Sequence, residues 1–399
     1  MPELIEAVRQ AVAAGRAPAP DVRLALAQSA DPVLLAAAGL ALAALRDPEG
    51  QLRALRVVLA PACPPGPLGA LLRAVLVAAG ARPELIELPC AALGSGPPAG
   101  PPGPAPDLLV RLLDESAFLP HRFDLTAPAA LGGHLERRLA QLAADLRSVG
   151  PVAIVLHTVP LPARLRDTVI GIRARALLTR LWYRLNAGLL ELAEQDQRIH
   201  VVDLAGLLST VPAAARDERR QARSDPPYTD RALLLLAEEV RRLGQARLGL
   251  SRRLLALGPD AERWPPEVRR TVALLAEQGV RLLPTDPHAP DPVERVLSER
   301  PEVLLRAELF ARRVVSWAPR AGNLRRAAET LGLGTESVVF LTASDFERGH
   351  VAAELPEVAV VDTGGGDPAQ LVRSLVGHGW FDVLEPAPDS ANQPYSPRN

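Results

Sequence analysis

Two side chains in the N-terminal half have the chemistry of a catalytic nucleophile and of a general base. Cys63 follows the apolar run at residues 55–60, and a thiol between a strand and a helix could be activated by the helix N-terminus. A small buried residue is the favoured interpretation of Cys63, because its flanking prolines remove N–H donors that an oxyanion needs. His157 ends the run VAIVLH and could act as a general base oriented by Asp203 or Asp225, although a hydrogen-bonded structural histidine is favoured.

Two further segments match catalytic or phosphate-binding motifs only in part. Asp225 begins the segment Asp225-Pro-Pro-Tyr228, where a GDSL/SGNH hydrolase carries Asp-x-x-His, and no Gly-Asp-Ser opens the first strand. A serine hydrolase is therefore not favoured. The glycines at 364–366 could cradle a phosphate on backbone N–H groups, but the Walker A and Rossmann spacings are both absent. We interpret this segment as a strand-to-helix turn.

The basic residues impose a further restriction, because all 45 of them are arginine. A Schiff-base enzyme needs a lysine amine, and both a Walker A loop and a protein kinase need a lysine on the phosphates. The sequence therefore excludes the conventional forms of these three chemistries. Codon bias of a GC-rich genome explains part of the arginine preference.

Composition narrows the class of protein. The chain has 399 residues, 48% hydrophobic and 23% charged, which suits roughly two or three domains with sizeable cores. The net charge of −1 argues against nucleic acid as the main partner. Cys63 and Cys90 make neither a disulfide framework nor a structural zinc site. No signal peptide is recognisable and the apolar stretch at 32–45 is too short to span a membrane, so we expect a cytoplasmic protein of bacterial type without a membrane partner.

The elements that must position these side chains alternate between helix and strand. Residues 1–50 have helical periodicity, and Asp31 is a candidate N-cap for a helix that begins at Pro32. From residue 51 onwards, short apolar strands alternate with helices of ten or more residues, a pattern typical of α/β folds with parallel sheets. Ligands of such sheets bind at the carboxyl ends of the strands. The proline-glycine stretch at 94–106 is a linker or loop, and the tail after residue 386 is predicted to be frayed.

Several blocks of the sequence follow the order of a known family. The most specific block surrounds Trp317 and Asn323 and reads ERPEVLLRAELFARRVVSWAPRAGNLRRAAETLGLGTESVVFLTASDFERGHVAAELPEVAVVD. More diffuse similarity extends through RVVLAPACPPGPLGALLRAVLVAAG, VAIVLHTVPLP and LLTRLWYRLNAGLLELAEQDQRIHVVDLAGL. Over nearly its whole length the chain resembles the FkbH-like branch of the haloacid dehalogenase (HAD) phosphatase superfamily. The resemblance implies an N-terminal helical segment (1–50), an SGNH-like α/β domain (51–248), a HAD-like Rossmannoid domain (249–386) and a tail (387–399).

The resemblance also implies a set of catalytic groups that this chain lacks. FkbH-like proteins remove phosphate from 1,3-bisphosphoglycerate and load the glyceryl unit onto an acyl carrier protein for polyketide assembly. They use an Asp-x-Asp-x-Thr motif after the first HAD strand, a cysteine, a lysine and an aspartate pair that holds magnesium. Here Asp-x-Asp is absent, and we place Arg252 and Arg253 about where its acids belong. The vestigial cleft is predicted to contain Thr285, Asp286, Arg320, Thr342, Ser344 and Asp345.

Loss of the nucleophile and of the magnesium acids indicates a pseudophosphatase without a cofactor. The first hypothesis is a non-catalytic binding or scaffold partner of an acyl carrier protein or a biosynthetic enzyme in polyketide or nonribosomal natural-product biosynthesis. Carrier proteins are usually acidic, so arginines are candidate contacts. By charge alone, these are Arg252, Arg253, Arg312 and Arg313.

Two alternatives remain open at this stage. The N-terminal domain could be an acyl or glyceryl transferase, or a hydrolase, of changed chemistry that uses Cys63 or His157. The old cleft could instead bind a small anion without metal, between Arg320, Thr342 and Ser344.

Overall fold

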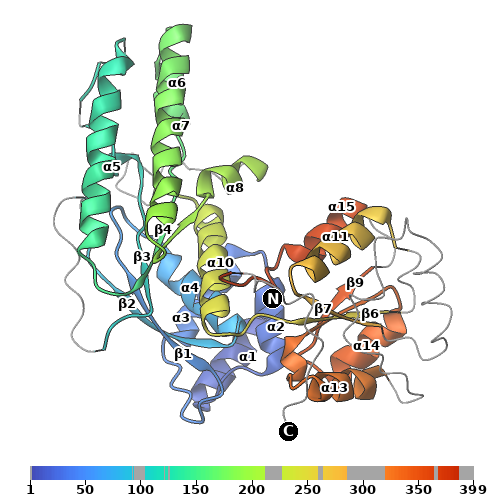
Figure 1. Cartoon of the computed structure of the whole chain (residues 1–399). Coiled ribbons are helices and arrows are strands. Elements are labelled where there is room, and N and C mark those ends of the chain that lie inside the picture. Colours follow the sequence, from blue (N-terminus) through green and yellow to red (C-terminus); the bar gives the residue numbers. More distant parts are fainter. Residues whose placement is uncertain are drawn as a thin grey trace. The chain divides into compact units, whose positions relative to one another are not determined.

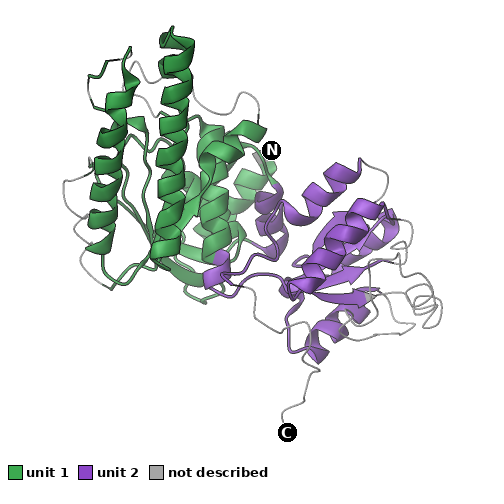
Figure 2. Cartoon of the chain, turned by 45° about the horizontal axis from the view of Figure 1, so that its top comes forward, with its two compact units in different colours: residues 1–18, 29–244 green, residues 19–28, 245–399 purple. Residues whose placement is uncertain are grey.

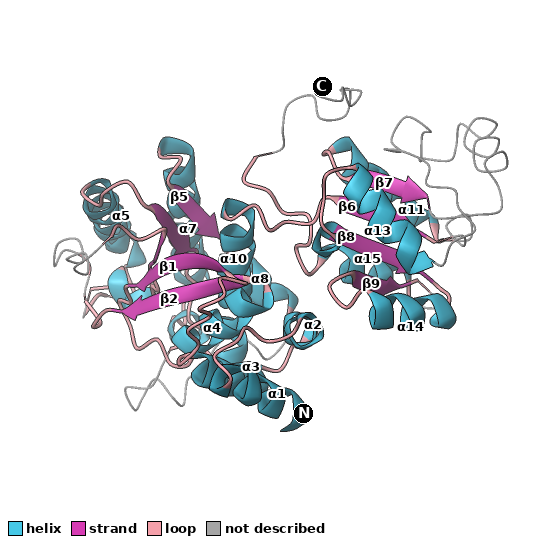
Figure 3. Cartoon of the chain, turned by 90° about the horizontal axis from the view of Figure 1, so that it is seen from below, coloured by secondary structure: helices cyan, strands magenta, loops and turns pink. Residues whose placement is uncertain are grey.

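The computed structural model describes residues 2–91, 93, 104–120, 122–124, 126–211, 227–258, 264–284, 320–363 and 367–385. The chain divides into two compact units, drawn in Figure 2. Unit 1 comprises Met1–Pro18 and Ser29–Gly244, and unit 2 comprises Ala19–Gln28 and Gln245–Asn399. Each unit is built on one parallel sheet (Figure 3), which confirms the α/β prediction.

Three helices precede the first strand: α1 (Pro2–Ala13), α2 (Pro20–Gln28) and α3 (Pro32–Leu42). Asp31 caps α3 as predicted, and its carboxylate accepts the N–H of Val33 at 2.9 Å and that of Leu34 at 3.3 Å. In unit 2, Leu24 and Ala27 of α2 pack against the hydrophobic core, an assignment that the sequence pattern did not indicate.

The sheet of unit 1 has the strand order β2-β1-β3-β4-β5, and all its neighbours are parallel. Its strands are β1 (Arg53–Leu59), β2 (Ala81–Glu87), β3 (Leu108–Val110), β4 (Ala153–His157) and β5 (Ile199–Val202). The helices after α3 are α4 (Leu68–Ala78), α5 (Leu131–Arg147), α6 (Ala163–Thr168), α7 (Ile172–Gln195), α8 (Leu204–Thr210) and α10 (Asp230–Arg247), with short 3-10 turns η1 (Glu115–Ala117) and η2 (Pro128–Ala130).

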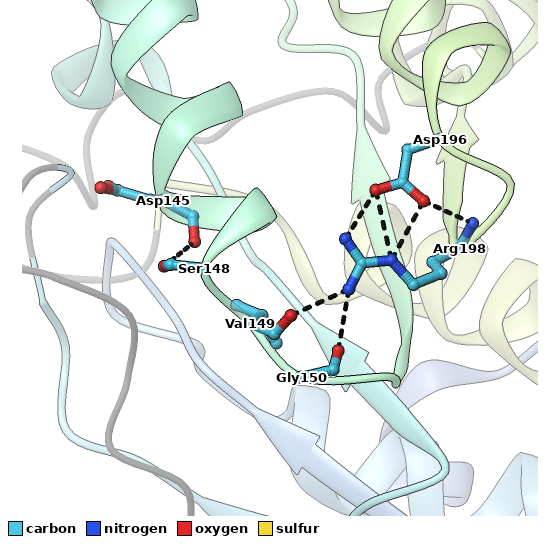
Figure 4. Close-up of polar contacts among 6 residues, drawn as sticks. All are labelled: Asp145, Ser148, Val149, Gly150, Asp196 and Arg198. Atoms are coloured by element: carbon cyan, nitrogen blue, oxygen red, sulfur yellow. Dashed lines mark hydrogen bonds and ion pairs between the residues drawn. The ribbon is translucent and has the colours of Figure 1, made fainter.

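Two close contacts join neighbouring elements of unit 1. Gly39 lets α3 approach α4 closely, because a Cβ at this position would lie 1.8 Å from the carbonyl oxygen of Ala70. At the amino end of the sheet, Arg198 binds both carboxylate oxygens of Asp196 and donates to the carbonyls of Val149 and Gly150 at 2.8 and 2.9 Å (Figure 4). Arg198 therefore fastens the turn before β4 to the turn before β5.

The sheet of unit 2 has the order β7-β6-β8-β9, again all parallel. The strands are β6 (Leu254–Leu257), β7 (Arg281–Pro284), β8 (Val338–Thr342) and β9 (Ala359–Asp362). Figure 1 shows α11 (Pro266–Glu277) and α15 (Pro368–Val376) on one face, and α13 (Arg320–Thr330) and α14 (Asp345–Glu354) on the other. The turn η5 (Thr335–Ser337) leads into β8. Both faces are covered, so successive residues of β6 enter opposite cores and the strand is apolar throughout.

The C-terminal part of unit 2 returns to the amino end of β6. The N–H of Arg252 donates to the Trp380 carbonyl at 2.7 Å, and the Ser251 hydroxyl donates to the Asp382 carbonyl. The Arg252 guanidinium lies 4.9 Å from the centre of the Trp380 ring and donates to the carbonyls of Val338 and Glu357. Burial lowers the pKa of Arg252 to about 10.

Among the helices in the described part of the chain, none combines the length and the apolar character that crossing a membrane requires.

Candidate functional site

His157 lies at the carboxyl end of β4 and is fully buried. Its Nε2 accepts the N–H of Leu113 at 3.0 Å, and its Nδ1 lies 2.9 Å from the carbonyl oxygen of Thr158. These backbone partners require a neutral ring with the proton on Nδ1, an assignment that follows from the hydrogen-bond network. Tyr228 meets the ring edge-on at 5.8 Å and donates its hydroxyl to the Leu113 carbonyl at 2.7 Å. Nε2 thus joins the end of β4 to the segment after β3, and Nδ1 bonds the backbone directly after β4, so both ring nitrogens have backbone partners.

Asp203, the predicted orienting acid, follows β5 and has other partners. Its carboxylate accepts the Thr158 hydroxyl at 2.8 Å and the Gly206 N–H at 3.1 Å, so it caps α8 and ties it to the end of β4. The other predicted acid, Asp225, lies outside the described residues.

The two cysteines differ in exposure. Cys63, after β1, is buried at 4% exposure, whereas Cys90 is exposed.

Charged residues directly after β3 were missed by the sequence reasoning. Glu115 is buried, and its carboxylate oxygen lies 3.2 Å from Nη2 of Arg164. Arg111 is also buried, and desolvation lowers its pKa while the charge of Asp145 opposes that shift. The signal was available in the sequence, because Arg111 and Glu115 follow a short apolar strand at its carboxyl end.

In unit 2, three of the predicted cleft residues meet at the carboxyl end of β8. Arg320 begins α13, Thr342 ends β8, and Ser344 caps α14. Nε of Arg320 donates to Oε1 of Glu347 at 3.0 Å, and Nη2 donates to the same oxygen. The Thr342 hydroxyl donates to Oε2 of Glu347 at 2.9 Å. Glu347, which the sequence analysis did not include in the cleft, is therefore its central acceptor.

The hydroxyl groups of Ser344 and Thr342 also accept backbone N–H groups within this cluster. The Ser344 hydroxyl accepts the N–H of Glu347 at 3.3 Å, and the Thr342 hydroxyl accepts the N–H of Ser344 at 3.2 Å. The first turn of α14 thus holds the Glu347 carboxylate over the end of β8.

The predicted cleft residue Asp345 takes part in a second ion-pair group. Arg348 binds Asp345 through Nη2 and Asp362 through Nη1, and Nη1 also lies 3.4 Å from the carbonyl of Thr342. Arg348 therefore links α14 to the ends of β8 and β9 and shares its single positive charge between two carboxylates.

The placement of Arg252 and Arg253 near the missing acids is wrong. Both precede β6 and lie at its amino end, where the N–H of Arg253 donates to the Ser337 carbonyl at 3.0 Å. In a parallel sheet the ligand end is the opposite one, and Gly258 follows β6 there, with its N–H on the carbonyl of Leu341 at 2.7 Å. Arg252 is committed to backbone carbonyls and to Trp380, so it is not available as a surface contact.

The remaining predicted residues, Thr285, Asp286, Arg312 and Arg313, lie outside the described ranges. The glycines at 364–366 lie outside them as well.

The described acids at this end of the sheet are paired with arginines. Mg²⁺ prefers free carboxylate oxygens in octahedral geometry. Here Glu347 is bound by Arg320, and Asp345 and Asp362 are bound by Arg348. Within the described ranges, no group of three or more His, Cys, Asp or Glu residues is arranged to hold a metal ion.

No model of a known protein family matches the chain, and no curated protein matches it in sequence. A solved structure is similar to it: the N-terminal part of the protein BF1531 from Bacteroides fragilis, which contains a phosphatase domain and was crystallised in complex with Mg. The two chains are 17% identical, the match covers 96% of this chain and 99% of the other, and the TM-score is 0.70. The likeness shows that the two chains share a fold.

Proposed function

We propose that the chain is a degenerate FkbH-like protein whose HAD-like unit is a pseudophosphatase and which acts by binding another protein. The observation that carries the proposal is the Arg320–Glu347–Thr342 cluster at the carboxyl end of β8. In the family that the sequence resembles, this place holds a lysine for phosphate and a pair of aspartates for magnesium. Here the cation is already neutralised by Glu347, and the strand ends in a threonine.

The first strand supports the same proposal. A HAD phosphatase needs a nucleophilic aspartate directly after this strand, and Gly258 follows β6. A glycine has no side chain to accept a phosphoryl group, so covalent phosphoryl transfer at this position has no attacking atom.

The proposed partner is an acyl carrier protein or a biosynthetic enzyme of polyketide or nonribosomal natural-product assembly, with unit 1 as the SGNH-like part. The geometry of His157 favours this binding role over acyl transfer in unit 1, because backbone groups occupy both of its ring nitrogens.

A phosphatase assay tests the proposal. Acetyl phosphate and p-nitrophenyl phosphate are incubated with the full chain and Mg²⁺, with and without EDTA, and the expected result is no turnover above buffer. The control is Arg320→Ala, which removes the cation of the cleft. EDTA-sensitive turnover that Arg320→Ala abolishes would overturn the proposal, whereas turnover that survives this substitution identifies a contaminating phosphatase.

A further inference from the structure

The solvent-facing side of α7 combines basic and apolar residues. The opposite side of this helix packs into the core of unit 1 through Leu178, Trp182, Leu185 and Leu189. The exposed residues recur at helical spacing on the outer side; they are Arg173, Ala176, Arg180, Tyr183, Arg184, Ala187 and Leu190. The first acidic residue of α7 is Glu191, so most of the helix presents positive charge alone.

The first half of α7 and its entry loop also expose large apolar side chains. Ile170 is 91% exposed, Ile172 is 82% exposed and Tyr183 is 70% exposed. Single exposed apolar residues are ordinary, but these three follow one helix and its entry loop. Ile172 also lines an open groove of about 710 Å³, together with Ala127, Pro128, Leu177 and others. α5 runs beside α7 in the same unit (Figure 1), and the groove lies between η2 and the start of α7.

The arginines of this side carry charge that the described residues do not balance. On the preceding helix, Arg164 is paired with Glu115 and Arg166 with Asp167. In contrast, no ion pair within the described part of the chain involves Arg173, Arg180 or Arg184. Their guanidinium groups are therefore complementary to carboxylates of another molecule.

We propose that this α7 face, defined as Ile170, Ile172, Arg173, Arg180, Tyr183 and Arg184, binds an acidic protein, with an apolar side chain of that partner in the groove. The proposal rests on the binding role proposed above, but not on the loss of phosphatase chemistry. Aromatic and arginine side chains are enriched in the central parts of protein interfaces, and charge complementarity speeds association and fixes orientation.

The same observations disfavour three other occupants. A second copy would bring arginine against arginine across a two-fold axis, which is repulsive. Nucleic acid binding needs a basic excess, and the chain has a net charge of −1. Lipid surfaces recruit clusters of about four to eight basic residues or free amphipathic helices, whereas the apolar side of α7 is buried in the core.

The test measures binding of a purified acidic acyl carrier protein to the full chain by isothermal titration calorimetry at low and at high salt. A triple charge-reversal variant should raise the Kd about tenfold or more and flatten its salt dependence. This variant combines Arg173→Glu, Arg180→Glu and Arg184→Glu. Ile172→Ser should raise the Kd about fivefold and leave the salt dependence intact.

The matched control is a second triple variant that changes the net charge of the chain by the same amount as the α7 variant. It reverses three exposed arginines elsewhere in unit 1, with Arg9→Glu, Arg53→Glu and Arg147→Glu. Circular dichroism checks that each variant is folded. The proposal is overturned if both triple variants weaken binding equally, if the carrier does not bind, or if phosphatidylserine vesicles or duplex DNA bind through the α7 face more tightly than the carrier does. Phosphatase turnover would refute the pseudophosphatase and leave this interface unaffected.

Discussion

Replacing Glu347 by glutamine should destabilise unit 2, because this carboxylate is the acceptor for both Arg320 and Thr342. Arg320 donates through Nε at 3.0 Å and through Nη2, and the Thr342 hydroxyl donates at 2.9 Å. The side chains of Arg320 and Glu347 are only 10% and 16% exposed. The glutamine keeps the shape and one acceptor oxygen, but leaves the Arg320 charge without its counter-ion.

The expected magnitude follows from this degree of burial. Breaking a fully buried ion pair costs about 3–5 kcal/mol, and an exposed pair contributes about 0–1 kcal/mol. A largely but not fully buried pair with one retained acceptor should therefore cost about 2 kcal/mol. With a urea m-value of about 2 kcal/mol/M, the unfolding midpoint should fall by about 1 M.

Tryptophan fluorescence can report on unit 2 alone. Of the four tryptophans in the chain, only Trp182 belongs to unit 1, so a Trp182→Phe background leaves the signal to the others. In this background, Glu347→Gln is compared with Glu354→Gln, an exposed acid of the same helix that should leave the midpoint unchanged. Combining Glu347→Gln with Arg320→Met should cost about 1–2 kcal/mol less than the sum of the single changes.

Magnesium distinguishes this interpretation from a retained metal site. If Glu347 held Mg²⁺, the ion would stabilise the parent chain by mass action, and Glu347→Gln would abolish that effect. We expect the unfolding midpoint to be independent of Mg²⁺. A midpoint that Glu347→Gln leaves unchanged would contradict the role of Glu347 as a structural counter-ion, and so would magnesium-dependent stabilisation that disappears in this variant.

Three further outcomes are expected. Asp196→Asn should lower the free energy of unfolding by about 1 kcal/mol at pH 7. Hydrogen bonds from Arg198 lower the pKa of Asp196 below 3.8 in the folded state, so this stabilisation is complete above about pH 4 and is lost as the pH falls through the folded-state pKa. The urea midpoints of variant and parent should therefore converge in strong acid. His157→Leu should cost about 3 kcal/mol in thermal unfolding and speed amide exchange at Leu113, because a buried N–H and a buried carbonyl lose their partner. Gly39→Ala should destabilise by about 1–3 kcal/mol through its clash with Ala70, whereas Gly349→Ala, with open space at its Cβ, should stabilise α14 by about 0.5–1 kcal/mol in the same urea assay.

Local patterns were sufficient to predict the α/β architecture. Buried parallel strands have continuous apolar sequence and the helices between them are amphipathic, so both could be located along the chain. The capping of α3 by Asp31 was predicted because it depends on residues within one turn. The attachment of α2 to unit 2 was not predicted, because its partners are distant in sequence.

The residues of the candidate site could be predicted from the sequence where they lie at the ends of strands. Arg320, Thr342 and Ser344 meet as expected because they border the carboxyl end of β8. Their shared partner Glu347 was not predicted, because a contact across 27 residues depends on how two helices pack and which rotamers result. The error at Arg252 and Arg253 arose because the resemblance did not locate the strand, which begins after them at Leu254.

Residues 251–252 contact residues 380–382, so the two ends of the C-terminal stretch of unit 2 lie side by side. The chain enters the parallel sheet and returns to the same place, with the Arg252 nitrogen 2.7 Å from the Trp380 oxygen. Adjacent ends are the geometry that tolerates circular permutation, since a short linker can join them and new termini can open at an exposed turn. A permuted or transplanted unit 2 would also need α2, whose Leu24 and Ala27 cover part of the core. The smallest transferable form of this unit therefore consists of two separate stretches of the sequence.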